Sequence, residues 1–162
     1  MHFSRIHTCL NCFTKNRISA RYLTATGQCA ICKTRFAPVS QPLDVDQASF
    51  ESIVRLARVP VLVAFRASWC AKSRNAGSEL RQLAFEMAGY GLVLCVDTDA
   101  NPDVIGTYNV RSTPSYALFR HGQLVLQRNR FLPRADVLRW TEPSAARAGN
   151  PLDSPWPRLA LS

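Results

Sequence analysis

Hydrophobic residues along the chain follow two spacings, one typical of buried strands and one typical of helices. Continuous apolar runs, typical of central strands covered on both faces, occur at residues 61–65 and 92–96. Two further runs predict a hairpin around His121-Gly122, at 116–119 and 124–127. Apolar residues recurring at helical steps predict helices at 46–58, 71–88, 102–108 and 133–140. The resulting order, α-β-α-β-α-β-β-α, predicts an α/β fold in which helices cover both faces of a central sheet.

Composition divides the chain into four segments. Residues 1–36 hold four cysteines among polar and basic residues, and they contain too few apolar residues for an independent core. Residues 37–45 contain two prolines and are expected to form a linker. The helices and strands above make 46–141 the main domain. Residues 142–162 contain four prolines and are expected to form a disordered tail.

The charge of the chain is strongly basic but scattered. The 162 residues carry a net charge of +9, with 17 Arg and 3 Lys. Because no run of basic residues occurs, we expect a solvated basic surface and not a nucleic-acid site, which retention on DNA at low salt would contradict. The sequence has no apolar run of about 18 residues, so no membrane span is expected. Residues 1–8 also lack the apolar stretch of a signal peptide, and we expect a cytoplasmic protein.

Four of the six cysteines form the pattern Cys-x2-Cys-x16-Cys-x2-Cys, namely Cys9, Cys12, Cys29 and Cys32. Two such knuckles supply four thiolates for a tetrahedral Zn²⁺ with no open position, which indicates a structural zinc site. Metal binding would supply the folding energy that residues 1–36 lack. The alternative is a pair of disulfides, which the lack of a secretion signal disfavours. His7 lies near this pattern, but four thiolates complete the shell and we expect His7 at the surface.

The segment 69–73, with the sequence Trp-Cys-Ala-Lys-Ser, directly follows a predicted strand. Cys70 should therefore lie at a helix N-terminus, where unpaired N–H groups and the helix dipole favour an anion. The positive charge of Lys72 and a hydrogen bond from Ser73 would further favour the thiolate, which is the nucleophilic form. Ser73 cannot form a disulfide, so a mixed disulfide on Cys70 would need an external thiol, such as glutathione, for its release.

Several motifs occur in the order and spacing of a known family: Trp69-Cys70-x-x-Ser73, residues 96–102 (Val-Asp-Thr-Asp-Ala-Asn-Pro), Val110-Arg111-Ser112-Thr113-Pro114, and Phe119-Arg120-His121-Gly122. They resemble a thioredoxin. With the four-cysteine segment ahead of them, the chain resembles more narrowly the thioredoxin 2 branch, which carries an N-terminal zinc-binding module. The resemblance spans residues 5–141 and implies a thioredoxin fold preceded by a small zinc-ribbon-like module. It also implies a cis Thr113-Pro114 bond and a substrate groove beside Cys70, formed by Trp69, Thr113, Pro114 and Arg130.

The chain departs from this family at several positions. The family motif is Trp-Cys-Gly-Pro-Cys, whereas residues 71–73 are Ala, Lys and Ser. Ala64 and Cys95 replace a buried Asp, thought to deprotonate the resolving thiol, and its Lys neighbour. Arg66 and Arg130 replace a Trp and a groove Gly. Losing both members of the Asp/Lys pair fits the loss of the resolving thiol and leaves no buried charge unpaired. Cys95 is expected to be a small apolar core residue, the alternative being a substitute resolving thiol.

Two functions are compatible with these residues. The first is a thioredoxin-like thiol–disulfide exchange protein in which Cys70 alone acts on protein disulfides or glutathionylated substrates, with Ser73 and Lys72 stabilising its thiolate. The second is a redox-inactive thioredoxin-fold binding module, with the zinc module as a docking surface. Fast alkylation of Cys70 near a pH of about 6 would favour the first, and an ordinary pKa of about 8.5 the second. An engineered origin of Ser73 also stays open, although the other departures favour natural divergence.

Overall fold

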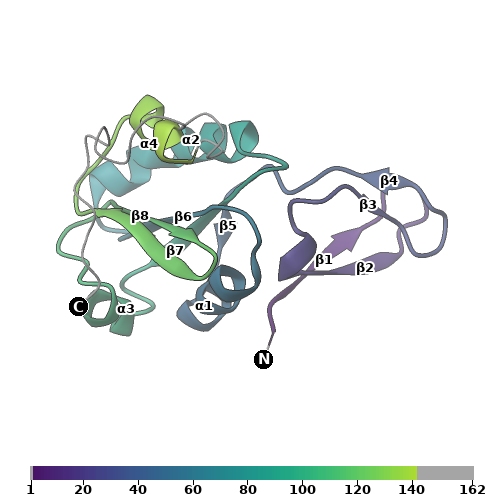
Figure 1. Cartoon of the computed structure of the whole chain (residues 1–162), viewed down its shortest axis with the longest axis horizontal. Coiled ribbons are helices and arrows are strands. Elements are labelled where there is room, and N and C mark those ends of the chain that lie inside the picture. Colours follow the sequence, from purple (N-terminus) through teal and green to yellow (C-terminus); the bar gives the residue numbers. More distant parts are fainter. Residues whose placement is uncertain (1, 142–162) are drawn as a thin grey trace.

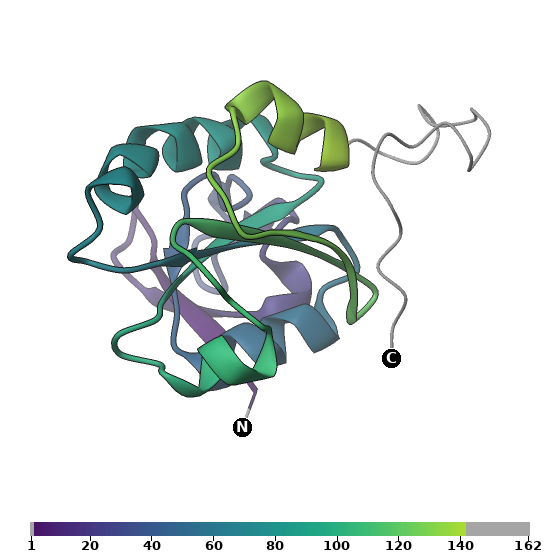
Figure 2. The ribbon, with the colours of Figure 1, turned by 90° about the vertical axis from the view of Figure 1, so that its left-hand side faces the viewer.

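A computed structural model describes residues 2–141, and its main part is a five-stranded mixed sheet between two layers of helices (Figure 1). The strands, in their spatial order, are β5 (Leu43–Asp44), β7 (Leu92–Asp97), β6 (Val61–Arg66), β8 (Ser115–Arg120) and β9 (Gln123–Arg128). The helices are α1 (Gln47–Leu56), α2 (Ala71–Glu86), α3 (Asp103–Thr107) and α4 (Arg134–Thr141). Helices α1 and α3 cover one face of the sheet and α2 and α4 the other, as Figure 2 also shows. The predicted α/β fold is confirmed.

The two continuous apolar runs are the parallel central strands β6 and β7, whose register pairs Val61 with Leu92. Strand β8 runs antiparallel to β6, and β9 runs antiparallel to β8. The turn between β8 and β9 is formed by His121 and Gly122, which have φ values of 50° and 77°. Positive φ at both central residues is what a two-residue hairpin turn of matching twist requires, so the predicted hairpin is confirmed.

The helix ends follow ordinary capping chemistry. The Asp46 side chain accepts a hydrogen bond from the Ser49 backbone N–H at 2.8 Å and caps the start of α1. Helix α2 ends at Glu86, and Gly89 just beyond it has a φ of 91°, where a residue without Cβ is unstrained. Both helices therefore lie where the hydrophobic spacing predicts them, with ends that differ by one or two residues.

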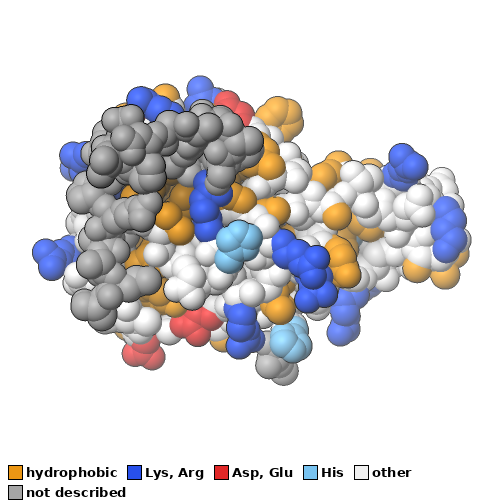
Figure 3. Space-filling view, viewed as in Figure 1, with side chains coloured by type: hydrophobic (Ala, Val, Ile, Leu, Met, Phe, Trp, Pro, Cys, Tyr) orange, Lys and Arg blue, Asp and Glu red, His pale blue; other side chains and the backbone are white. Residues whose placement is uncertain are grey.

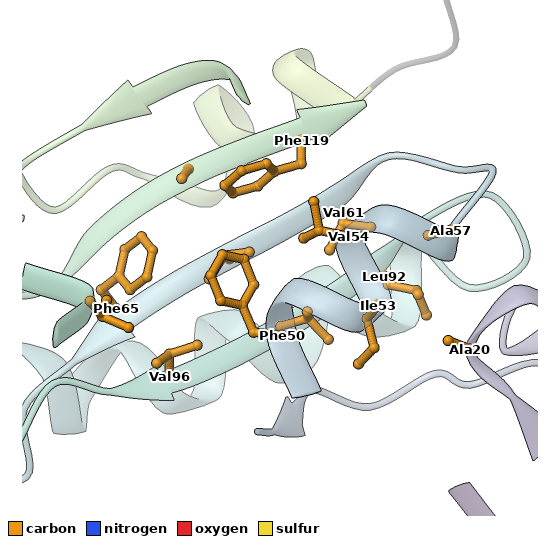
Figure 4. Packing of buried hydrophobic residues seen from close by; sticks show 14 of the residues in the cluster. Ala20, Phe50, Ile53, Val54, Ala57, Val61, Phe65, Leu92, Val96 and Phe119 are labelled. Carbon is orange, nitrogen blue, oxygen red and sulfur yellow. The ribbon is translucent and has the colours of Figure 1, made fainter. Parts of the chain in front are cut away.

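The core between the sheet and α1 is built around aromatic rings (Figure 4). Phe50 of α1 is 0% exposed. Its ring meets the edges of Phe65 and Phe119, at centroid distances of 6.1 Å and 5.5 Å. A second cluster packs α2 and α4 on the opposite face, with Leu80 and Trp140 buried in it. The sheet is therefore covered on both faces, which explains the continuous apolar runs of β6 and β7.

Residues 2–36, which we call the N-terminal module, form two small hairpins. Their elements are β1 (Ser4–Thr8) with β2 (Lys15–Ser19), a 3-10 helix η1 (Ala20–Tyr22), and β3 (Gly27–Gln28) with β4 (Arg35–Phe36). Ala20 and Leu23 are buried in the same cluster as Phe50. Figure 4 shows Ala20 on the Leu92 side of that cluster, at the end away from Phe65. The module thus shares the core of the main domain.

Backbone hydrogen bonds strengthen this attachment. The Phe3 N–H donates to the Ser52 hydroxyl at 3.0 Å, and the Val39 N–H donates to the Leu23 carbonyl at 2.9 Å. Within the segment expected to be a linker, 37–45, the structure places β5, which pairs in parallel with β7 at the edge of the sheet. A strand of two residues leaves no periodic pattern in the sequence. The tail expected at 142–162 lies outside the described residues. Over residues 2–141, none of the helices combines the length and apolar character needed to cross a membrane.

Candidate functional site

Cys70 lies at the junction of the central strand β6 and helix α2. It is the N-cap residue of α2, with extended backbone angles (φ −82°, ψ 116°). The Cys70 N–H donates to the Ala67 carbonyl at 3.1 Å, which closes the turn between strand and helix. The Cys70 side chain is partly exposed, so a dissolved substrate can reach its sulfur.

The first turn of α2 lowers the pKa of the Cys70 thiol from an ordinary 9.0 to about 7. The largest cause is the backbone N–H of Ser73, followed by the Ser73 hydroxyl and the Thr113 side chain. Partial burial acts in the opposite direction, and the Lys72 backbone N–H adds a smaller lowering. Because donors stabilise the thiolate, this turn favours the nucleophilic form. Lys72 acts on the sulfur through its amide, while its side chain is exposed.

Ser73 has a second contact beneath the site. Its side chain is buried, with 2% of the residue exposed, and its hydroxyl accepts a long hydrogen bond from the Ala67 N–H at 3.5 Å. Ser73 is therefore placed both to donate toward the sulfur and to hold the turn that leads to Cys70.

A second loop, which ends in the Thr113-Pro114 peptide, faces the thiol. This peptide bond is cis, as the resemblance implies. The Thr113 carbonyl oxygen lies 3.3 Å from Cys70 Sγ, and the protonated thiol donates to it. Pro114 is buried at the start of β8, whereas Thr113 is partly exposed beside the sulfur. The structure thus brings Cys70, Ser73 and Thr113 together.

Asn129, directly after β9, holds this loop in place. Its side-chain oxygen accepts hydrogen bonds from the Arg111 N–H at 3.2 Å and the Ser115 hydroxyl at 3.0 Å. Its side-chain nitrogen donates to the Asn109 carbonyl at 3.3 Å. The role of Asn129 could not be predicted from the sequence, because a single asparagine after a strand belongs to no motif.

Trp69 and Arg130 lie on the exposed surface. Trp69 is 71% exposed, and its indole Nε1 donates to Asp99 Oδ1 at 3.1 Å. Asp99 lies in the loop after β7 and was also missed as a site residue, although its motif was noticed. Arg130 is exposed and follows Asn129. Neither side chain contributes to the lowered pKa of Cys70.

Apolar residues occupy the two positions that align with the family's buried Asp/Lys pair. Ala64 and Cys95 are register partners on β6 and β7, and they are 0% and 3% exposed. Burial raises the pKa of the Cys95 thiol to about 11, so this thiol is neutral near pH 7. Arg66 extends to the sheet edge and pairs with Asp44 at 2.9 Å. Because the Asp44 side chain is 83% exposed, this ion pair contributes little stability.

The four N-terminal cysteines meet in space. Their sulfurs all lie within 4.8 Å of one another, and the Cys9–Cys32 and Cys12–Cys29 pairs are each 3.5 Å apart. A tetrahedral Zn²⁺ with Zn–S bonds of about 2.3 Å places its sulfurs about 3.8 Å apart, so the cluster fits a four-thiolate metal site. The Thr34 hydroxyl, 3.1 Å from Cys32 Sγ, is the main cause that lowers the Cys32 pKa to about 5.

The two knuckles have the same local geometry. The Cys9 N–H donates to the Thr14 carbonyl and the Cys29 N–H to the Thr34 carbonyl, each at 2.9 Å. Phe13 and Lys33 follow the second cysteine of each knuckle in left-handed conformations, with φ values of 58° and 61°. Each turn therefore aims two sulfurs at one point.

Asn16 joins the two knuckles. It is 8% exposed, its side-chain nitrogen lies 3.6 Å from Cys29 Sγ, and its side-chain oxygen accepts from the Ala30 N–H at 2.9 Å. A donor to a metal-bound sulfur is a second-layer contact that orients the ligand. Asn16 belongs to no sequence motif that would predict this role.

The sheet and the Cys70 site lie in a part of the chain that matches a known family. The thioredoxin family profile matches residues 41–141. Thioredoxin C-3 of Corynebacterium nephridii is 26% identical over 137 residues, which are 85% of this chain and 93% of that protein. The thioredoxin of Rhodospirillum rubrum is 33% identical over 100 residues, which are 62% of this chain and 96% of that protein. A solved mutant thioredoxin from Halobacterium salinarum NRC-1 is similar with a TM-score of 0.61 at 22% identity, covering 72% of this chain and 99% of that chain. This last likeness shows the thioredoxin fold.

Proposed function

The chain belongs to the thioredoxin family, and on that premise we propose that it exchanges thiols and disulfides through one reactive cysteine, Cys70. The observation that carries the proposal is the partly exposed Cys70 at the start of α2, with a pKa of about 7. Near neutral pH about half of such a thiol is thiolate, whereas a thiol with an ordinary pKa is mostly protonated. A thioredoxin fold kept only for binding has no need of a lowered thiol pKa.

The reaction has two exchange steps. In the first, the Cys70 thiolate attacks one sulfur of a protein disulfide or a glutathionylated cysteine, the S–S bond breaks, and the second sulfur leaves as a thiolate. This forms a mixed disulfide on Cys70. In the second step, an external thiolate such as glutathione attacks the mixed disulfide and releases Cys70 as a thiolate. With a glutathionylated substrate the two steps yield the free protein thiol and oxidised glutathione, so two electrons pass from glutathione to the substrate disulfide. With a protein disulfide they leave one substrate sulfur bonded to glutathione, and a second round of the same two steps completes the reduction.

Two residues of the chain explain why the mixed disulfide on Cys70 needs an external thiol for its release. Ser73 stands where a resolving thiol would attack, and an alcohol cannot displace a thiolate from a disulfide. Cys95 is buried, and with a pKa of about 11 it supplies almost no thiolate. We therefore assign release to an external thiol. The partly exposed Thr113, which precedes the buried Pro114, would align an extended substrate, with Trp69 and Arg130 bordering it.

We also propose that the four N-terminal cysteines hold a structural Zn²⁺. The donor set supports this, because four thiolates in a closed shell leave no position for a substrate. When bound, the ion would cross-link the two knuckles of a module whose buried residues otherwise lie in the main domain's core. Thiolate ligands need a reducing compartment such as the cytoplasm.

Turnover with glutathione tests the proposal. We expect the protein to accelerate the reduction of a glutathionylated peptide by glutathione, and the Cys70→Ser variant to lose this activity. Cys95→Ser is the matched control and is expected to keep it. With insulin and dithiothreitol we expect weak activity that rises in Ser73→Cys, which restores a resolving thiol. Equal activity of wild type and Cys70→Ser would show that the domain only binds.

A further inference from the structure

The N-terminal module contains a groove that the proposed exchange reaction does not use. The groove lies between the β1–β2 hairpin and the chain that leaves β4. Its lining includes the aliphatic residues Ile18, Leu23 and Val39, the aromatic residues His7, Tyr22 and Phe36, and the basic residues Arg5 and Arg35. The lining therefore combines apolar surface with positive charge.

One wall of the groove is built around the Phe36 ring. The His7 ring lies against it at a centroid distance of 4.4 Å. In the β3–β4 hairpin, Gly27 of β3 pairs with Phe36 of β4, and a Cβ on Gly27 would lie 2.0 Å from the Phe36 ring. Gly27 therefore lets the ring lie flat on the backbone. This packing gives the groove a wall that is already formed in the free protein.

The charge around the groove has one sign. Residues 1–36 contain six Lys or Arg and no Asp or Glu, and no carboxylate lines the groove. Accordingly the module in Figure 3, on the right, shows blue and orange surface without red. Among the ion pairs of the described residues, none involves the module. Arg5 and Arg35 therefore reach the groove without a carboxylate partner in the described chain.

We propose that this groove binds an acidic segment of a partner protein, with the partner's carboxylates at Arg5 and Arg35 and its apolar side chains against Ile18, Leu23 and Val39. Charge complementarity selects the acidic class. The aliphatic residues Ile18, Leu23 and Val39 favour a protein, whose apolar side chains pack against them. The rings of His7, Tyr22 and Phe36 are surfaces on which a base would stack, so oligothymidine is the competing probe in the test.

The groove and the reactive thiol lie at different ends of the sheet. The module's Ala20 packs at the Leu92 side of the core, where β7 begins, whereas Cys70 follows the other end of β6, beyond Phe65 (Figure 4). Binding in the groove therefore does not need the thiol, and the inference stands independently of the proposed exchange reaction.

Fluorescence anisotropy on the intact zinc-loaded protein tests the proposal. The probe is a short fluorescein-labelled peptide rich in Glu and Leu, and its control is the same peptide with every Glu replaced by Gln. The groove variant is Arg5→Gln with Arg35→Gln. The matched control variant is Lys15→Gln with Arg17→Gln, which loses the same charge on the outer face of the hairpin, where Arg17 pairs with the exposed Ile6.

We expect the Glu peptide to bind and the groove variant to weaken it about fivefold or more, with less than about twofold change in the outer-face variant. Cys70→Ser should bind as wild type does. Circular dichroism and zinc content check that each variant is folded. Equal weakening by both double variants, equal binding of the Gln peptide, tighter binding of oligothymidine, or no binding of the Glu peptide would each overturn the proposal.

Discussion

The reactivity of Cys70 rests on donors that a single substitution can remove in part. Ser73→Ala deletes the hydroxyl, which is the second cause of the lowered pKa of Cys70, and keeps the backbone N–H, which is the first. We therefore expect the Cys70 pKa to rise in this variant but to stay below 9.0.

The size of the effect follows from the charge on the acceptor. One hydrogen bond to a charged group corresponds to a shift of about one pKa unit. The pKa of Cys70 would then rise from about 7 to about 8. At pH 7 the thiolate fraction falls from about a half to about a tenth, and the alkylation rate falls about fivefold with it. The thiolate fraction grows as pH rises, so wild type and variant should converge above a pH of about 9.

The assay is the rate of iodoacetamide modification of Cys70 as a function of pH, followed by mass spectrometry of the peptide that contains it. Ser78→Ala is the matched control, because Ser78 lies on the same helix, is exposed, and bonds only locally to the Asn75 carbonyl. Thermal unfolding accompanies both variants, since Ser73→Ala also leaves the buried Ala67 N–H without its acceptor.

Two results would refute this reasoning. A wild-type midpoint near 9.0 would mean that the first turn of α2 does not stabilise the thiolate. An unchanged midpoint in Ser73→Ala would mean that the hydroxyl does not act on the sulfur. A midpoint that shifts equally in Ser78→Ala would point to a general loosening of α2.

Other changes have distinct expected results. Asn129→Ala should raise KM for a disulfide substrate, because Asn129 holds the loop of Thr113. It should raise the Cys70 alkylation midpoint less than Ser73→Ala does, because the Thr113 side chain is a smaller cause of the lowered pKa than Ser73; an unchanged KM would contradict that role. Phe50→Ala, at a position 0% exposed, should destabilise the fold by about 3–5 kcal/mol in urea unfolding, and a loss below about 1 kcal/mol would contradict the packing of that core. Chelation should abolish the circular dichroism of the module and lower its melting temperature, and Asn16→Ala should weaken zinc retention about tenfold or more; an unaltered spectrum after chelation would rule out a structural metal.

The order of helices and strands could be read from the sequence because burial dictates it. Strands β6 and β7 are covered on both faces, and only continuous apolar runs satisfy that environment. The His121-Gly122 turn was equally visible, because few residue pairs adopt positive φ twice in succession. Strand β5 could not be predicted from the sequence, because two residues at a sheet edge show no hydrophobic periodicity.

The site divided in the same way. Cys70 and the four clustered cysteines could be predicted from residue type and spacing, because thiolate chemistry and metal coordination accept few other side chains. Asn129 and Asn16 could not be identified from the sequence, because an amide that orients a neighbour has no sequence pattern of its own. The motif that contains Asp99 did not indicate its hydrogen bond to Trp69. All three roles depend on hydrogen bonds to residues that lie 13 to 30 positions away.

The amino-acid sequence alone determined that this chain joins a four-cysteine module to a thioredoxin domain in which Ser73 replaces the family's second cysteine. It did so because apolar periodicity and the identity of a nucleophile are local properties. Only the tertiary structure decided that Cys70 is partly exposed and hydrogen-bonded to the Thr113 loop, whereas Cys95 is buried. It also decided that buried residues of the module pack into the core of the main domain. Those properties arise from contacts between distant segments, and the packing of the folded chain alone sets them.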